Sequence, residues 1–182
     1  PVGKQLAALA ASHMKRSTME LGGHAPVIVA ADADMDLTLG LMVAHKLRNA
    51  GQVCVSPTRY LVEAPVADDF ITRFTAGAKA VVVGDGMDPA TQMGPLANDR
   101  RIPALESLVA DAVARGARLM TGGRRIGNQG WFFEPTVLAD VPVDARIMNE
   151  EPFGPVAVIH RYADMDALIA EPNRLPFRPA GH

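Results

Sequence analysis

The feature that most constrains the fold of this chain is the alternation of short β-branched runs with amphipathic stretches. Runs such as 26–30 and 156–161 predict buried strands, whereas apolar residues three and four positions apart predict helices between them. The predicted strands are 17–21, 26–30, 58–63, 117–121, 135–139 and 156–161, and the predicted helices are 3–16, 35–49, 66–80, 98–115 and 165–170. This alternation is typical of an α/β fold with a mainly parallel sheet flanked by helices.

Composition excludes several classes of function. The 182 residues carry 18 Lys and Arg against 20 Asp and Glu, so they lack the basic excess that binding to nucleic acid requires. The pairs Arg100-Arg101 and Arg124-Arg125 are too short to supply it, and we expect them to be solvated. The sequence contains neither an apolar run long enough to span a membrane nor an export signal at its first residues. We therefore expect a cytoplasmic protein with neither nucleic acid nor membrane as a partner.

Cys54 is the sole cysteine, which excludes an intrachain disulfide and a multi-cysteine metal site. It could be a buried small hydrophobe, an exposed thiol or a nucleophile. Its place in a loop that contains Gly51, just after a predicted helix, favours accessibility to a ligand. A free thiol with a pKa of ~8.5 is only about 3% thiolate at pH 7, so a nucleophile here needs a lowered pKa or a nearby base. The spacing of the histidines and methionines suggests no metal site.

Two further clusters contain acidic residues. Glu20 runs into Gly22-Gly23, where two glycines leave room around a carboxylate, although a solvated strand end is the alternative. The segment 150–155 holds two acids and an aromatic residue between prolines, so it cannot form a regular helix. By itself it is a turn before the predicted strand 156–161. His24 follows the glycines and is expected to be a loop residue rather than a proton carrier.

Taken together, these clusters resemble the aldehyde dehydrogenase superfamily. The runs Met19-Glu20-Leu21-Gly22-Gly23, Gly51-Gln52-Val53-Cys54 and Glu151-Pro152-Phe153-Gly154-Pro155 occur in the order and approximate spacing of that family. The resemblance extends to 93–96, 122–123, 133–138 and 169–177, and so covers nearly the whole chain, from about residue 1 to 177.

The resemblance implies oxidation of an aldehyde with NAD or NADP as hydride acceptor, through a thiohemiacetal and a thioester. Cys54 matches the family nucleophile, and Glu20 matches the general base that activates the hydrolytic water. Glu151 matches the residue that binds the nicotinamide ribose, and Phe153 matches its neighbour against the nicotinamide. The backbone of Leu21 and Gly22 matches the lining of the nicotinamide pocket.

Arg48 lies six residues before Cys54, at a position that in semialdehyde-oxidising members binds the substrate carboxylate. A guanidinium suits a carboxylate because it can donate two hydrogen bonds at once. This match makes succinate-semialdehyde dehydrogenases the most similar members in motif. The alternative is an exposed arginine that the helix dipole favours at a helix end.

The resemblance also implies a domain organisation. Residues 1–21 would be the end of an NAD(P)-binding domain, 22–177 the aldehyde dehydrogenase catalytic domain and 178–182 a divergent tail. Family members are longer, so we expect an incomplete cofactor site and little NAD-dependent activity from these 182 residues alone. A homo-oligomer is expected for full-length members. Two alternatives stay open: a non-catalytic remnant with at most a subunit-interaction role, and a cofactor-independent thiol esterase that uses Cys54 and Glu20.

Overall fold

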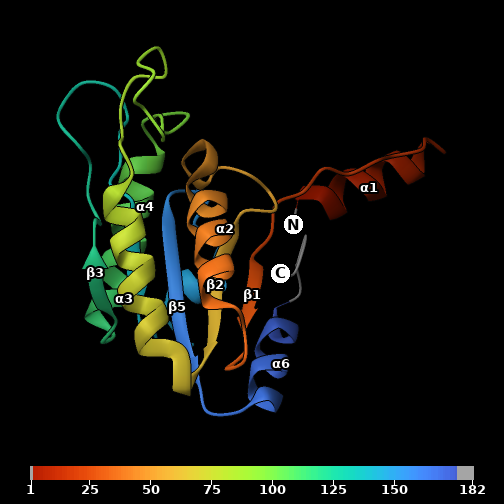
Figure 1. Ribbon diagram of the computed structural model, residues 1–182. Helices are drawn as coiled ribbons and strands as arrows, with labels where there is room; N and C mark the ends of the chain where they lie inside the picture. The colour runs from red at the N-terminus through yellow and green to blue at the C-terminus, as the bar shows by residue number, and fades with distance from the viewer. Residues whose placement is uncertain (1, 176–182) are drawn as a thin grey trace.

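The computed structural model describes residues 2–175, and a five-stranded sheet flanked by helices forms its centre (Figure 1). The strand order is β1-β2-β5-β4-β3, and β3 alone among these strands runs antiparallel to its neighbour. The predicted α/β fold with a mainly parallel sheet is therefore confirmed. The strands are β1 (Ala25–Val29), β2 (Pro57–Glu63), β3 (Arg118–Thr121), β4 (Thr136–Ala139) and β5 (Val156–Tyr162).

The helices begin close to the predicted positions, but α1 ends before the predicted residue 16 and α6 continues past the predicted residue 170. They are α1 (Val2–Ser12), α2 (Met35–Leu47), the 3₁₀ helix η1 (Arg48–Gly51), α3 (Ala64–Ala80), α4 (Arg101–Ala114), α5 (Arg146–Asn149) and α6 (Met165–Arg174). The Asp34 carboxylate caps α2 by accepting a hydrogen bond from the Leu37 N–H at 3.0 Å. The short helix α5 was not predicted. The predicted tail 178–182 lies outside the described residues.

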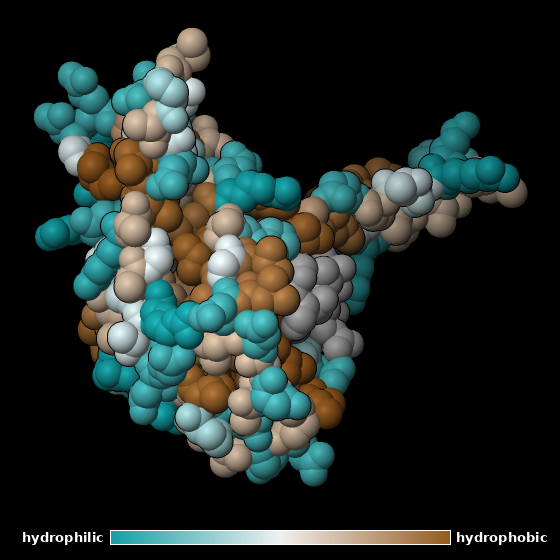
Figure 2. Space-filling model, viewed as in Figure 1, coloured by the Kyte–Doolittle hydropathy of each residue, from teal (hydrophilic) through white to brown (hydrophobic). Residues whose placement is uncertain are grey.

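The predicted strand 17–21 is wrong, because residues 15–24 have no regular secondary structure. Among the described strands β1 is at one end of the sheet and pairs with β2, so no strand lies beside 17–21 to share hydrogen bonds with it. Together with this segment, α1 forms an arm that projects from the sheet (Figure 1). Val2, Leu6 and Leu9 of the arm are at least half exposed, and brown apolar surface is visible on it (Figure 2).

The central strand β2 is buried on both faces. On one face the Tyr60 ring packs against Phe70 and Phe74 of α3, with ring centroids 5.7 and 4.9 Å apart. Because side chains alternate along a strand, Arg59 points to the opposite face. There its guanidinium binds the Glu171 carboxylate of α6 at 3.1 Å, and both side chains are buried. The helices α3 and α6 therefore cover opposite faces of β2.

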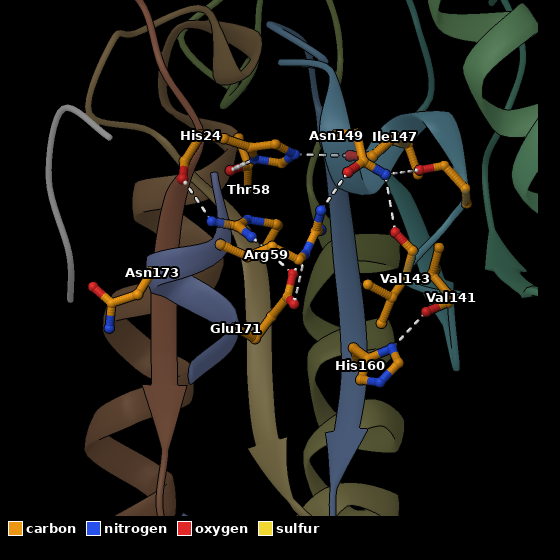
Figure 3. Close-up of polar contacts among 12 residues, drawn as sticks. His24, Thr58, Arg59, Val141, Val143, Ile147, Asn149, His160, Glu171 and Asn173 are labelled. Atoms are coloured by element: carbon orange, nitrogen blue, oxygen red, sulfur yellow. Dashed lines mark hydrogen bonds and ion pairs between the residues drawn. The ribbon is translucent and has the colours of Figure 1, made fainter. Parts of the chain in front are cut away.

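A polar network connects α6 with α5 and with the residue before β1 (Figure 3). Arg59 donates a hydrogen bond to the His24 carbonyl at 3.2 Å as well as to Glu171. Glu171 also accepts from Arg174 at 2.8 Å, and the same Arg174 guanidinium donates to Asn149 Oδ1 at 2.6 Å. The network thus fixes the chain just before β1 and at the end of α5. His24 directly follows the motif that contains Glu20, and Asn149 directly precedes the motif that contains Glu151.

The His24 ring belongs to this layer and is fully buried. Its Nε2 lies 2.8 Å from the Ile147 carbonyl of α5 and must carry a hydrogen to bond there, while its Nδ1 contacts the Thr58 hydroxyl. Burial, reinforced by the nearby positive charge of Arg59, lowers the His24 pKa from 6.5 to about 3. His24 is therefore a neutral structural link between β1, β2 and α5.

Replacing His24 with Gln should reduce the acid sensitivity of the fold. The unfolded chain takes up a proton on this ring between pH 6.5 and 3, whereas the native state does not, so stability is lost as the pH falls through that window. Between pH 7 and pH 4 the variant should lose about 3 kcal/mol less unfolding free energy than the wild type, as measured by urea denaturation.

The matched control is His13→Gln, because His13 is exposed at the end of α1. Its pH dependence should equal that of the wild type. Identical acid sensitivity in His24→Gln and the wild type would show that His24 is not neutral in the native protein.

Candidate active site

The three motif segments each precede a parallel strand at the same edge of the sheet. Residues 20–24 lead into β1, residues 51–56 into β2 and residues 150–155 into β5. The strand register places Ala25 beside Pro57 and Arg59 beside Val158, so the amino ends of the three strands are adjacent. Segments that are far apart in the sequence therefore converge at one edge.

Two glycines allow these segments to touch. A Cβ on Gly51 would lie 2.1 Å from the Gly154 carbonyl oxygen, and a Cβ on Gly22 would lie 2.4 Å from Glu151 Oε2. The Glu151 carboxylate also accepts a hydrogen bond from the Gly23 N–H. The 151–154 segment is thus in contact with both of the other segments. A side chain is excluded by backbone at Gly51, whereas at Gly22 it would displace the Glu151 carboxylate.

Cys54 lies on a turn between η1 and β2. The Ser56 N–H donates to the Val53 carbonyl at 2.9 Å and closes this turn. Just before it, Asn49 and Ala50 adopt left-handed backbone angles, with φ of 50° and 51°. This reversal ends the helix earlier than predicted and directs the chain to the sheet edge. The thiol is partly exposed, which excludes the interpretation of Cys54 as a core residue.

Side-chain amides hold the turn in place. Asn49 Nδ2 donates to the Gln52 carbonyl, and Gln52 Nε2 donates to the Asn49 carbonyl, both at 3.1 Å. The Gln52 Oε1 accepts from the Ala97 N–H at 2.8 Å. These bonds attach the Cys54 turn to the loop before α4, so its position is determined by tertiary contacts as well as by its own sequence.

Glu20 and Leu21 are placed differently from the other motif residues. Both are exposed, and the Glu20 carboxylate makes no hydrogen bond or ion pair with any described residue. Leu21 packs against Gly3 of α1, where its Cδ2 lies 2.8 Å from the position of a Cβ. The structure therefore brings Gly22 to Glu151 but leaves the Glu20 carboxylate free in the arm segment.

Arg48 is exposed at the end of α2 and lines a groove of about 1020 Å³ between α2 and α3. Asp36, His45, Arg73 and Gln92 also line the groove, and Asp36 pairs with Arg73. Neither Cys54 nor Glu20 lines this groove. The Arg48 guanidinium makes no hydrogen bond or ion pair among residues 2–175, so it is available to an anion.

Two cations near Glu151 were not identified from the sequence. Lys46 is fully buried in α2, with Nζ 3.5 Å from Ser56 Oγ, and burial lowers its pKa from 10.5 to about 7, against the effect of Glu151. Arg101 donates to the Pro152 carbonyl, so the expectation that it is solvated is wrong. Lys46 follows Leu39 by seven residues, a helical spacing that indicated the buried face.

Opposing influences act on the Glu151 carboxyl. Burial raises its pKa, whereas the Gly23 hydrogen bond and the charges of Arg101 and Lys46 lower it, with burial the largest contribution.

Within residues 2–175, no three His, Cys, Asp or Glu side chains are grouped as metal ligands would be. In the same range, no helix has the length and apolar character needed to cross a membrane.

Gly51→Ala should destabilise the fold and separate the Cys54 turn from the 151–154 segment. The new Cβ would collide with Gly154, and the positive φ of 69° is unfavourable for alanine. We expect a loss of about 3 kcal/mol or more in unfolding free energy, measured by urea denaturation.

Gly40→Ala in α2 is the matched control, because nothing lies within 4 Å of its Cβ position. It should stabilise the protein by up to about 1 kcal/mol through helix propensity. Equal stabilities of the two variants would contradict the close approach at Gly51.

Comparison with known proteins identifies the family and the fold of this chain. The aldehyde dehydrogenase family profile matches residues 1–181. The chain is 50% identical over 182 residues to 4-(hydroxymethyl)benzenesulfonate dehydrogenase TsaD1 of Comamonas testosteroni, covering 100% of this chain and 38% of the relative. It is 44% identical over 169 residues to succinate-semialdehyde dehydrogenase of Paenarthrobacter nicotinovorans, covering 92% and 38%.

Among solved structures, succinate-semialdehyde dehydrogenase from Burkholderia pseudomallei matches with a TM-score of 0.93 at 42% identity, over 97% of this chain and 36% of that chain. The chain thus spans about 38% of the length of the curated relatives it matches. The family profile, however, covers nearly all of the chain, and the fold similarity extends over nearly all of it as well. The chain therefore belongs to the aldehyde dehydrogenase family of oxidoreductases.

Proposed function

We propose that this chain carries the chemical centre of an enzyme that oxidises an aldehyde to its acid with NAD or NADP. The observation that supports this most is the convergence of the Cys54 turn, Gly22-Gly23 and Glu151 at the amino edge of the sheet. In this proposal the thiol attacks the aldehyde, while the Glu151 carboxylate and the glycine backbone bind the nicotinamide end of the cofactor beside it. Family membership supports the same reaction class.

Cys54 is the nucleophile in this proposal. Its position on a partly exposed turn gives the thiolate access to an aldehyde carbonyl, with which it forms a carbon–sulfur bond and a thiohemiacetal. The Cys54 N–H then stabilises the oxyanion by a hydrogen bond. NAD or NADP, held at Glu151, would supply the hydride acceptor for this oxidation, and the product on Cys54 would be a thioester.

Glu20 is the general base for the second step. Its unpaired carboxylate removes a proton from a water molecule, and the resulting hydroxide attacks the thioester carbon and releases the acid and the Cys54 thiol. Because Glu20 lies in the irregular segment 15–24, its carboxylate is not fixed by a helix or strand.

A nicotinamide ribose fits the residues at this edge. The Glu151 carboxylate uses one acceptor position for the Gly23 N–H and retains others for the two hydroxyls of a ribose. The missing side chain at Gly22 makes room for the Glu151 carboxylate, and Phe153 supplies an apolar ring two residues further on. We assign residues 1–21 to the cofactor-binding part of the protein and the remainder to the catalytic part; within the first range, residues 2–21 form the projecting arm.

The substrate proposed is an aldehyde that bears an acidic group. The two relatives carry names that specify a sulfonate and the semialdehyde of a dicarboxylic acid. The Arg48 guanidinium is exposed and unpaired, and it can bind either anion with two parallel hydrogen bonds. This role places Arg48 at the distal end of the substrate, away from the reacting carbonyl.

The nucleophile and base can be tested in the 182-residue chain through ester hydrolysis, which needs no cofactor. We expect hydrolysis of p-nitrophenyl acetate that falls at least ~100-fold in both Cys54→Ser and Glu20→Gln. Asp32→Asn is the control, because Asp32 is exposed beyond the carboxyl end of β1, and it should leave the rate unchanged. A rate that survives in Cys54→Ser would contradict the assignment of the nucleophile.

Substrate selection can be tested in a chimera in which this chain replaces the matching 182 residues of TsaD1. Arg48→Leu should lower kcat/KM for a carboxylate-bearing aldehyde ~10- to 100-fold, because a charge-assisted hydrogen-bonded pair is lost. A neutral aldehyde should be oxidised at the unchanged rate, and Arg100→Leu should change neither substrate. Equal losses for both aldehydes would contradict the role of Arg48.

A further inference from the structure

The segment Glu151-Pro152-Phe153-Gly154 has a conformation that its own residues do not favour. Phe153 has a φ of 36°, in the left-handed region that disfavours residues with a side chain. Residues 151–153 form neither helix nor strand. A segment of this kind keeps one conformation only when its surroundings hold it.

The first turn of α4 supplies that support. The Arg101 guanidinium donates a hydrogen bond to the Pro152 carbonyl, just before the strained residue. Leu105, one helical turn later, packs against the residue just after it, because a Cβ on Gly154 would lie 2.6 Å from Leu105 Cδ1. Helix α4 therefore contacts the segment on both sides of Phe153.

Arg101 also acts on Glu151 electrostatically. Its positive charge lowers the pKa of that carboxyl, and Lys46 of α2 does the same from another element. Arg101 is itself partly buried, and its Nε is enclosed without a hydrogen-bond partner among the described residues. Enclosing an unpaired donor is unfavourable, so stability alone does not account for an arginine at this position.

We propose that Arg101 is a positioning residue that fixes the 151–154 segment through the Pro152 carbonyl and so holds the Glu151 carboxylate at the Gly23 N–H, ready for a ribose diol. The inference rests on the proposed role of Glu151 in cofactor binding. Arg101 does not touch the cofactor or the aldehyde in this scheme. The adjacent Arg100 is exposed and takes no part.

The effect on Glu151 can be measured in the 182-residue chain without cofactor. In Arg101→Gln, the pKa of Glu151 should rise by about one unit in a ¹³C NMR titration of the labelled carboxyl group, because a cation is lost. The Gly23 amide should exchange with solvent at least ~10-fold faster, because its acceptor is no longer held in place. Arg100→Gln is the matched control and should reproduce the wild type in both measurements.

Arg101→Lys tests the effect of charge separately from that of geometry, and it replaces Arg101→Gln in these measurements if that variant does not fold. It retains the cation but not the planar fork that reaches the Pro152 carbonyl, so the Glu151 titration should stay close to that of the wild type while Gly23 exchange still accelerates. Wild-type titration and exchange in the folded Arg101 variants would overturn the inference.

The same substitutions in the TsaD1 chimera distinguish the two proposals. If Glu151 binds the ribose and Arg101 positions it, then Glu151→Gln and Arg101→Gln should each raise KM for the cofactor ~10-fold or more, with a smaller change in kcat. A normal KM in Arg101→Gln with a raised KM in Glu151→Gln would overturn the role of Arg101 alone. A normal KM in Glu151→Gln would overturn the proposed cofactor site itself.

Discussion

The parallel register of β1, β2 and β5 is the constraint on which the rest of the site depends. Three segments with no sequence proximity meet because their strands begin side by side, Ala25 next to Pro57 and Arg59 next to Val158. A shift of one residue in either pairing would turn buried side chains to the opposite face, so the packing of the core fixes the register. Many open α/β sheets bind ligands at the carboxyl ends of their strands, whereas the candidate site residues converge here at the amino ends.

A buried ion pair stabilises this edge of the sheet. Arg59 connects the start of β2 to α6 through Glu171 and to the chain before β1 through the His24 carbonyl. Removing one partner of a buried ion pair commonly destabilises a protein by about 3–5 kcal/mol, because the other charge is left in an apolar surrounding. The helix α6 carries none of the proposed site residues. Its contacts nevertheless fix two of the segments that carry them, the one before β1 and the one after α5.

Local sequence signals predicted most of the fold, and tertiary contacts account for what they missed. The periodicity around β2 and α3 is local, and both elements were predicted correctly. Residues 17–21 have strand-forming composition but no neighbouring strand among the described residues, so their composition alone was misleading. The motif resemblance identified Cys54 and Glu151 as candidates. Arg101 was missed because its partner, the Pro152 carbonyl, is distant in sequence.

The strained residues explain why the conformation at the site needs so much support. Ala50 and Phe153 adopt left-handed angles, which cost about 1–2 kcal/mol each for residues with a Cβ. Glycine at position 50 would relieve the backbone, but Ala50 is only 1% exposed, so its methyl group fills space that glycine would leave empty. Packing therefore opposes the local backbone preference at the residue before Gly51. The glycine is needed one position later, where the Gly154 carbonyl leaves no room for a side chain. The order Ala50-Gly51 thus follows from two contacts. Packing at position 50 needs a methyl group, whereas the Gly154 carbonyl excludes one at position 51.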